Sequence, residues 1–229
     1  MDNTDQKLEK PDLLKRMASV ASHEIRNPLA IISNSLYFIK TKLGAGGAAV
    51  DPKITKHIGI IEGEVKRSND VLEEMLAFTR TKEMHPATAS VNSAIKDLTG
   101  AYVFPASITV KAVPDPSDPC VNADMEAVSC ALRHILDNSV QAMPEGGTVT
   151  IEASHDAKRA LLTVTDSGPG LPDGDWEQVF EPFFTTKPRG IGLGLTIARK
   201  FLEQQAGTVT AQNAAGGGAK VTLSLPLTQ

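Results

Sequence analysis

Apolar residues in the first third of the chain follow two helical stripes. Residues 14–43 place an apolar side chain every three or four positions, the spacing of a coiled-coil seam, with a local break around residues 21–29. The glycine-rich run 44–47 ends this helix, and a second stripe, which includes Met75, follows over residues 54–79. The pattern predicts a helical hairpin. Because a lone hairpin buries one stripe poorly, we expect two copies to form a four-helix bundle.

Both strand and helix periods occur in the rest of the chain. The predicted elements are strands over residues 108–113, 148–153 and 161–165, helices over 125–142 and 193–205, and two strands over 207–225 around the glycines 216–218. Gly207 is expected to close the second of these helices as its C-cap. Helices packed on one face of a mixed sheet form an α/β sandwich. The predicted fold class is therefore α+β, with a hairpin domain over residues 1–86 and an α/β domain over residues 87–229.

Composition narrows the classes of function. The 229 residues carry 23 basic and 27 acidic side chains, a net charge of −4, which lacks the basic excess of a nucleic-acid-binding surface. The two cysteines, Cys120 and Cys130, are too few for a disulfide framework and lack metal-ligand spacing, which fits a reducing compartment. No apolar run reaches the roughly 18 residues of a membrane span. We therefore expect a cytoplasmic chain that contacts neither nucleic acid nor a membrane.

One histidine stands out on the first predicted helix. At about 100° per residue, His23 points about 200° away from the seam residue Ile25, and it lies beside Glu24. Asn27 shares its face, and Pro28 interrupts the helix, a costly break beside a titratable group that suggests function. A neutral imidazole is a nucleophile near pH 7, and a neighbouring carboxylate can accept its other ring proton. The alternative is a solvated helix face that carries an incidental histidine.

Two glycine-rich runs suit a nucleotide site. One follows a predicted strand, and the other begins a predicted helix. Asp166 begins the run 166–170 after a strand. Its carboxylate can accept a hydrogen bond from an exocyclic amine such as that of adenine, and the glycines let the backbone approach a flat base. The run 190–195 opens a helix whose backbone amides can cradle phosphate, although it is neither a Walker A loop nor a GxGxxG motif. The alternatives are a turn after a strand and a flexible loop before a helix.

A polar helix face and an aromatic loop complete the candidate chemistry. His134 and Asn138 lie four residues apart on one face of a predicted helix, and the asparagine oxygen is a suitable ligand for Mg²⁺. The alternative is an ordinary polar helix face. The three phenylalanines of residues 180–184 either fill the core or anchor a mobile lid over residues 171–189, whose Lys187 reaches phosphate.

Together, five motifs in this order resemble the catalytic core of a two-component sensor histidine kinase. The phosphoacceptor box corresponds to residues 23–29, the asparagine box to 134–143, the glycine boxes to 166–170 and 190–194, and the phenylalanine box to 180–184. The resemblance covers residues 10–226. The runs 138–144 and 181–187 look like the nitrogen-regulation-type branch of the family.

The resemblance implies a dimerisation and histidine-phosphotransfer hairpin joined to a Bergerat-type ATP-binding domain. It implies that His23 is phosphorylated, that Glu24 is its base, and that Asn27 supports dephosphorylation of the partner aspartate. Asn138 would hold Mg²⁺ and Asp166 would read adenine. The other residues implied in the nucleotide pocket are Gly168, Gly170, Lys187, Gly190, Gly192, Leu193, Gly194 and Thr196.

Three features depart from the family pattern. His134 stands where relatives usually carry asparagine or glutamate, so its part in holding Mg²⁺ is left open. Ile191 replaces a common threonine, and Thr196 is a candidate to supply the phosphate hydroxyl instead. The lid over residues 171–189 is short, which leaves few groups to close over ATP.

The implied reaction is transfer of the ATP γ-phosphoryl group to His23 and then to an aspartate of a response-regulator receiver domain, with phosphatase activity toward that regulator. ATP, Mg²⁺ and a second copy of the chain in a homodimer are implied. One rival is an ATPase or chaperone-like member of the same nucleotide-binding superfamily, which would lack an exposed histidine on a dimerising hairpin. Another is a non-catalytic scaffold, against which the intact Asn138 and Asp166 argue. A third keeps the family but makes the phosphatase activity dominant.

Overall fold

The computed structural model divides the chain into two compact units, Met1–Thr81 and Lys82–Gln229. The described residues are 22, 25–26, 29–34, 36–37, 39–41, 43, 52–80, 82–172, 176–187 and 190–228. Among these residues, no helix is both long enough and apolar enough to cross a membrane.

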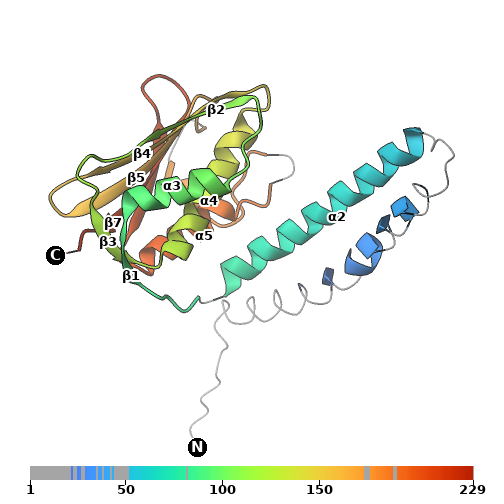
Figure 1. The fold of residues 1–229 in the computed structure, drawn as a ribbon, viewed down its shortest axis with the longest axis horizontal. Helices are drawn as coiled ribbons and strands as arrows, with labels where there is room; N and C mark the ends of the chain where they lie inside the picture. The colour runs from blue at the N-terminus through green and yellow to red at the C-terminus, as the bar shows by residue number, and fades with distance from the viewer. Residues whose placement is uncertain are drawn as a thin grey trace, which may run out of the picture. The chain divides into compact units, whose positions relative to one another are not determined.

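The first unit contains a helical hairpin. Helix α2, Pro52–Thr79, is 28 residues long, and the described residues that precede it are helical as well. The Arg26 guanidinium lies 2.6 Å from the Glu73 carboxylate, and the Lys40 ammonium lies 2.9 Å from the Glu62 carboxylate. A later position in the first helix thus meets an earlier position in α2, so the two helices run antiparallel (Figure 1). The predicted hairpin is confirmed.

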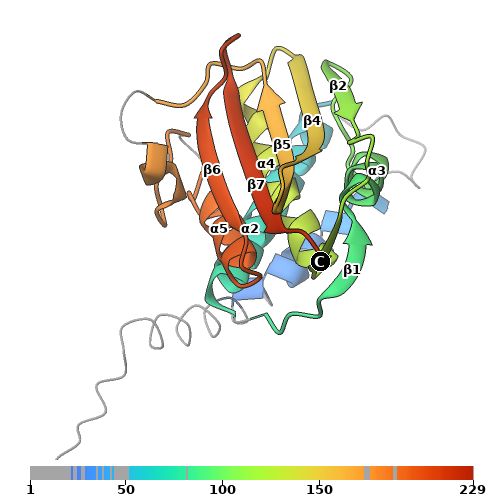
Figure 2. The same ribbon diagram turned by 90° about the vertical axis from the view of Figure 1, so that its left-hand side faces the viewer.

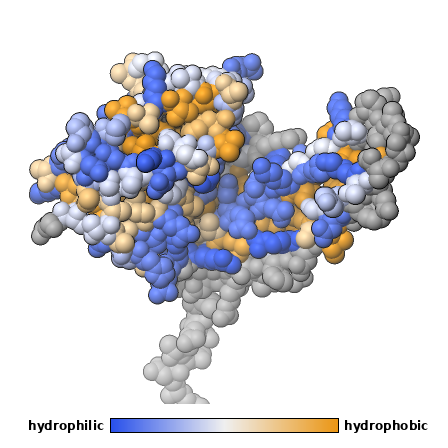
Figure 3. Space-filling model, in the orientation of Figure 1, coloured by the Kyte–Doolittle hydropathy of each residue, from blue (hydrophilic) through white to orange (hydrophobic). Residues whose placement is uncertain are grey.

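The hairpin buries only part of its apolar stripes. The buried apolar side chains are Leu36, Ile58, Val65, Leu72 and Leu76. Near the end of α2, Leu76 and Thr79 are buried, whereas the predicted Met75 is half-buried. Thr79 is the last residue of the predicted stripe, and Leu76 lies one helical turn after Leu72. The predicted stripe residues that stay 41–46% exposed are Ile25, Ile32, Ile39 and Ile61. Figure 3 shows apolar residues at the surface of the hairpin among hydrophilic ones.

The second unit is built on a five-stranded mixed sheet. In spatial order its strands are β2 (Ile108–Val113), β4 (Gly147–His155), β5 (Arg159–Asp166), β7 (Ala219–Pro226) and β6 (Thr208–Asn213). Strand β2 pairs parallel with β4, and all other neighbours pair antiparallel. A second sheet pairs β1 (Ala87–Ser90) with β3 (Cys120–Ala123). The predicted strands of the large sheet are confirmed, whereas β1 and β3 were not predicted.

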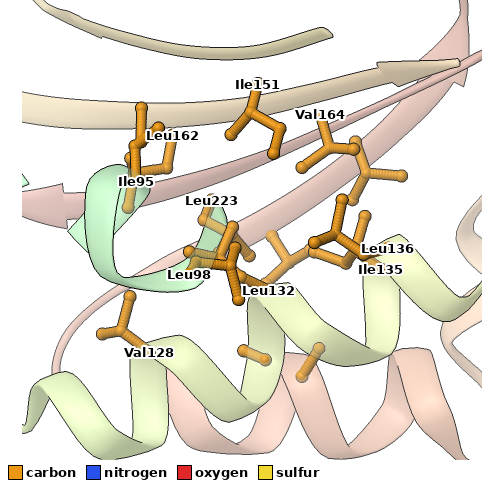
Figure 4. Close-up of a cluster of buried hydrophobic side chains, with 14 of the residues drawn as sticks. Ile95, Leu98, Val128, Leu132, Ile135, Leu136, Ile151, Leu162, Val164 and Leu223 are labelled. Atoms are coloured by element: carbon orange, nitrogen blue, oxygen red, sulfur yellow. The ribbon is translucent and has the colours of Figure 1, made fainter. Parts of the chain in front are cut away.

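Helices cover one face of the large sheet. They are α3 (Val91–Ala101), α4 (Met125–Ala142) and α5 (Gly194–Glu203), and a short 3₁₀ helix, η1 (Trp176–Phe180), precedes α5. Figure 2 shows α4 and α5 behind the sheet and α3 beside its β2 edge. Fully buried Leu132 and Ile135 of α4 face Ile151 and Val164 of the sheet, which are paired across β4 and β5 (Figure 4). The predicted α/β sandwich is confirmed.

Helix α4 begins and ends where the sequence predicts. Its N-cap is Asp124, whose carboxylate accepts a hydrogen bond from the Ala127 N–H at 3.0 Å. The preceding helix α3 was not predicted. Ser90 caps it by accepting a hydrogen bond from the Ser93 N–H at 3.1 Å.

The end of α5 differs from the prediction. Gly207 donates its N–H to the Leu202 carbonyl at 2.8 Å, and Ala206 donates to the Glu203 carbonyl at 3.2 Å. This pair of bonds forms a Schellman motif in which Ala206, with φ of +54°, is the left-handed residue. The predicted C-cap position of Gly207 is therefore wrong by one residue, because the left-handed turn falls on the alanine before it.

Candidate functional site

The phosphoacceptor box lies mostly outside the described residues. His23, Glu24, Asn27 and Pro28 all fall in that part of the chain, so their roles stay predictions. The described neighbour Arg26 lies in the helix and pairs with Glu73 of α2. The geometry of the site is therefore that of the second unit.

Asp166 ends strand β5 and is buried, with 6% of its surface exposed. Its Oδ1 accepts hydrogen bonds from the backbone N–H groups of Gly168 and Ala219, each at 3.0 Å. Bonds to a carboxylate are stronger than neutral ones, so these two fix the side-chain orientation. Within the described part of the chain both bonds go to Oδ1, which leaves Oδ2 to accept a hydrogen bond from a ligand.

The first glycine run is held by a residue that the sequence did not single out. Gly170 has φ of +83°, and the next residue, Leu171, donates its N–H to Asn213 Oδ1 at 2.6 Å. The Asn213 amide nitrogen donates back to the Leu171 carbonyl at 3.3 Å. Asn213 ends strand β6, 42 residues away along the chain. No local pattern marks such a contact, and only its position at the end of a predicted strand could have pointed to it.

Asn138 and Lys187, both predicted site residues, lie together. The Lys187 ammonium donates to Asn138 Oδ1 at 2.6 Å, although the two residues are 49 positions apart. The same ammonium donates to Gln141 Oε1 at 2.8 Å. Gln141 was not predicted. Its spacing of three residues from Asn138 on one helix is the signal that could have found it.

These amide oxygens fit a divalent cation. A positive group already lies on Asn138 Oδ1, so the oxygen is oriented for a cation, and Mg²⁺ prefers hard oxygen ligands and keeps several waters. No group of three or more His, Cys, Asp or Glu side chains among the described residues could hold a metal ion. A metal ion here would therefore be held by Asn138, water and the phosphates of a nucleotide.

The second glycine run forms a tight bend before α5. Gly192 has φ of +72°, and its carbonyl accepts the Phe183 N–H at 2.9 Å. A Cβ atom at Gly192 would lie 2.3 Å from the Phe184 carbonyl oxygen, so the backbone segments touch. Leu193 follows as a fully buried residue at the helix N-cap, and Gly194 begins α5.

The backbone N–H groups at the start of α5 are suited to phosphate, because the first turn of a helix has no intrahelical acceptor for them. Gly190, at the start of the same run, donates its N–H to the Lys187 carbonyl at 3.1 Å. The Thr196 hydroxyl donates to the Phe180 carbonyl at 3.0 Å. Thr196 thus anchors η1 in this structure, and its predicted contact with phosphate stays a prediction.

His134 packs against the start of α5. A Cβ atom at Gly194 would lie 3.4 Å from His134 Nδ1, an ordinary contact distance. Burial lowers the pKa of His134, and the nearby Asp137 carboxylate opposes that shift only in part. The imidazole is therefore neutral at pH 7.

The phenylalanine motif divides between core and surface. Phe180 is buried in the core and Phe184 packs partly against it, whereas Phe183 is 56% exposed. The Arg199 guanidinium lies 4.0 Å from the centre of the Phe180 ring and 2.6 Å from the Glu177 carboxylate. Of the two alternatives for these rings, core filling holds for Phe180 and in part for Phe184, whereas Phe183 lies at the surface. We call residues 176–187 the lid segment.

Two family models match the chain. The model of the His Kinase A (phospho-acceptor) domain matches residues 13–83, and that of histidine kinase-, DNA gyrase B-, and HSP90-like ATPases matches residues 123–229. The chain therefore carries the phospho-acceptor and ATPase domains that make up a sensor histidine kinase core. The second unit of the histidine kinase, with Asn138, Asp166 and both glycine runs, is thus an ATP-binding domain of this class.

Similar proteins include curated relatives and solved structures. The histidine kinase is 30% identical over 223 residues to sporulation kinase C of Bacillus subtilis (strain 168), which is 96% of this chain and 50% of that protein. It is 29% identical over 222 residues to sensor histidine kinase ZraS of Escherichia coli O157:H7, which is 96% of this chain and 47% of that protein. The histidine kinase chain therefore spans about half the length of the curated relatives it matches. The structure of histidine kinase ThkA in complex with response regulator protein TrrA matches with a TM-score of 0.70 at 26% identity, over 97% of this chain and 64% of that chain.

Proposed function

We propose that this histidine kinase transfers the γ-phosphoryl group of ATP to the His23 imidazole and then to an aspartate of a response-regulator receiver domain. The supporting observation is the pairing of Asn138 with Lys187 in the unit that matches the ATPase model, on a chain whose other unit matches the phospho-acceptor model. Glu24 accepts the second ring proton of His23 and stabilises the positive charge that develops on the imidazole during attack.

The nucleotide roles follow from the second unit. Asp166, fixed by two backbone N–H groups, accepts a hydrogen bond from the adenine amine through its remaining oxygen. Asn138 and the phosphates hold Mg²⁺, which neutralises phosphate charge when bound. The N–H groups at the start of α5 and the Lys187 ammonium stabilise the remaining negative charge. The domain that carries these residues comprises residues 87–229, and the hairpin domain comprises residues 1–86.

A homodimer completes the hairpin. Its exposed isoleucines support this proposal, because Ile25, Ile32 and Ile39 of the first helix and Ile61 of α2 are 41–46% exposed on one hairpin. Burying an exposed aliphatic side chain contributes roughly 1.5–3 kcal/mol when complete. Two hairpins that bury these faces against each other form a four-helix bundle.

The same chain also removes the phosphoryl group from the regulator by hydrolysis, which releases inorganic phosphate. We propose that the Asn27 amide positions a water for hydrolysis of the phosphorylated regulator. Asn27→Ala is expected to slow the loss of phosphate from a phosphorylated receiver domain.

We also propose that the chain acts in the cytoplasm. Because of the runs 138–144 and 181–187, we place it nearest the nitrogen-regulation-type branch of the family.

Phosphotransfer profiling tests the proposed function. The chain is labelled with γ-phosphate-labelled ATP and then mixed with a panel of receiver domains. We expect label to leave the kinase and appear on one or a few receivers within seconds to minutes. Release of inorganic phosphate without any labelled protein would instead favour an ATPase of the same superfamily.

A further inference from the structure

The Lys187 ammonium donates hydrogen bonds to two neutral amides. Its Nζ lies 2.6 Å from Asn138 Oδ1 and 2.8 Å from Gln141 Oε1. The two amides lie three residues apart on α4, so their side chains share a face of the helix. Both bonds have a charged donor, which makes them stronger than amide–amide bonds. The pair forms a small cation site made of oxygen atoms.

That cation site coincides with the proposed metal ligand. Asn138 Oδ1 is the atom that would bind a divalent cation, and the Lys187 ammonium lies on it at 2.6 Å. An ammonium and a divalent cation repel each other strongly at contact distance. The two cannot share Oδ1, so one must leave when the other arrives.

We propose that Gln141 is a further residue of the nucleotide site, and that it acts together with Asn138 to hold Lys187 as a stand-in cation until nucleotide binds. The inference rests on the proposed function, in which Asn138 faces the phosphates. When nucleotide binds, the ammonium leaves the amide pair and pairs with phosphate. We call the contact of Lys187 with the two amides the amide latch.

The amide latch is connected to the second glycine run through the backbone of Lys187. The Lys187 N–H donates to Thr185 Oγ1 at 3.1 Å, and the Lys187 carbonyl accepts the Gly190 N–H at 3.1 Å. A Cβ atom at Gly190 would lie 2.6 Å from Thr185 Oγ1, so this bend is tightly packed. Release of the lysine therefore changes the restraint on residue 190, where the phosphate-binding run begins. The residue that carries the latch is thus tied by its backbone to the start of that run.

Hydrogen exchange of the nucleotide-free protein tests the latch without any activity measurement. The variants are Gln141→Leu, which removes one of the two oxygens, and Lys187→Met, which removes the ammonium. Gln204→Leu is the matched control, because Gln204 is an exposed glutamine at the end of α5 and away from the latch. We expect amides of the lid segment to exchange about three- to tenfold faster in both latch variants, since a bond to a charged group restrains local opening.

The double variant shows whether the two residues act together. If Gln141 and Lys187 form one interaction, exchange in the double variant matches that of Lys187→Met alone. Saturation with a non-hydrolysable ATP analogue and Mg²⁺ should restore Gln141→Leu to the protection of the wild type, because the lysine then pairs with phosphate. Equal exchange in Gln141→Leu, Gln204→Leu and the wild type, or additive effects in the double variant, would overturn the proposal.

Affinity for the same analogue gives a second readout. We expect Gln141→Leu to bind about two- to tenfold more tightly, because the nucleotide-free state no longer gains the bond to Oε1. We expect Lys187→Met to bind more weakly, because phosphate loses a cationic partner. Weaker binding by Gln141→Leu would contradict the latch. Failure of the wild type to bind the analogue at all would instead contradict the proposed function, whereas the exchange of the nucleotide-free protein tests the latch by itself.

Discussion

Gly218 lies directly against the backbone of Asp166. A Cβ atom at Gly218 would come within 1.8 Å of the Asp166 carbonyl oxygen, and the Gly218 backbone has φ of +86°. The residue that follows, Ala219, donates its N–H to Asp166 Oδ1. The glycine thus allows the loop before β7 to reach the carboxylate at the end of β5. The position of the proposed adenine-reading group depends on this contact.

Three alanine substitutions in this loop separate the effect of a positive φ from the effect of close backbone contact. Gly216 has neither a neighbour within 4 Å nor a positive φ, Gly217 has φ of +90° in open space, and Gly218 has both a positive φ and a clash. We expect Gly216→Ala to change the free energy of unfolding by less than about 0.5 kcal/mol and Gly217→Ala to lower it by about 1 kcal/mol. We expect Gly218→Ala to lower the free energy of unfolding more than either of the other two substitutions and to weaken nucleotide binding. Urea unfolding and analogue titration measure the two effects, and equal values for Gly217→Ala and Gly218→Ala would contradict the role of the contact.

Asp166→Asn tests the reading of adenine. The amide oxygen can keep the bonds from Gly168 and Ala219, so we expect the melting temperature to change little. The amide nitrogen then replaces Oδ2 and turns an acceptor into a donor that faces the exocyclic amine. Loss of a hydrogen bond to a charged group corresponds to roughly 1.5–3 kcal/mol, or about a 10- to 150-fold weaker affinity. Calorimetric titration with an ATP analogue that gave the wild-type affinity would exclude Asp166 as the adenine contact.

Ala206→Gly should stabilise the second unit. Ala206 is the left-handed residue of the Schellman motif that ends α5, with φ of +54°. Glycine adopts this conformation without steric cost, so we expect the free energy of unfolding to rise by about 0.5–1 kcal/mol. Thermal or urea unfolding of the two proteins measures the change. A destabilised Ala206→Gly variant would show that the backbone at this position is relaxed in the wild type.

Asp115 links the stability of the second unit to acid pH. His155 Nδ1 lies 2.6 Å from Asp115 Oδ2, and the Ser117 N–H and hydroxyl each donate to Oδ1 at 2.8 Å. The contact with His155, helped by Ser117, lowers the pKa of Asp115 to about 2. The ordinary pKa of an aspartate is about 3.9. The ionised carboxylate therefore stabilises the fold above about pH 4, and this contribution is lost as the pH falls toward 2.

Asp115→Asn measures that contribution. We expect the variant to be less stable than the wild type at pH 7, with a difference that shrinks between about pH 4 and pH 2. Urea unfolding across this range measures the difference. Asp97→Asn, at an exposed position on α3, is the matched control. A difference for Asp115→Asn that stayed constant down to pH 2 would contradict the depressed pKa.

Much of the fold of the second unit was predictable because local patterns agree with tertiary contacts. Helix α4 matches its predicted bounds, since a cap at Asp124 precedes a regular apolar spacing. Helix α3 was missed although Val91, Ala94, Ile95 and Leu98 are all buried at helical spacing. The two strands that were missed, β1 and β3, are each four residues long, too short for a clear alternating pattern. The short length of these strands, more than their composition, limited the prediction there.

The site residues likewise comprise some that local motifs predict and others that only long-range contacts place. Asn138, Asp166 and Lys187 lie in recognisable runs, and the structure brings the first and third of them into contact. Gln141, Asn213 and Gly218 were not predicted, because each contacts a residue 42 to 53 positions away or supports such a contact. Long-range contacts of this kind are set by how loops meet at the edge of the sheet. Only Gln141 has a local signal, its spacing of three residues from Asn138 on one helix.

Whether the γ-phosphoryl group is found on His23 is the decisive test of the proposed kinase reaction. The wild type and His23→Ala are incubated with γ-phosphate-labelled ATP, and incorporated label and analogue affinity are measured on the same preparations. We expect label on the wild type that is lost in acid, as for a phosphorylated imidazole, and none on His23→Ala, whose analogue affinity stays within about twofold. Stoichiometric label on His23→Ala would contradict the proposed reaction.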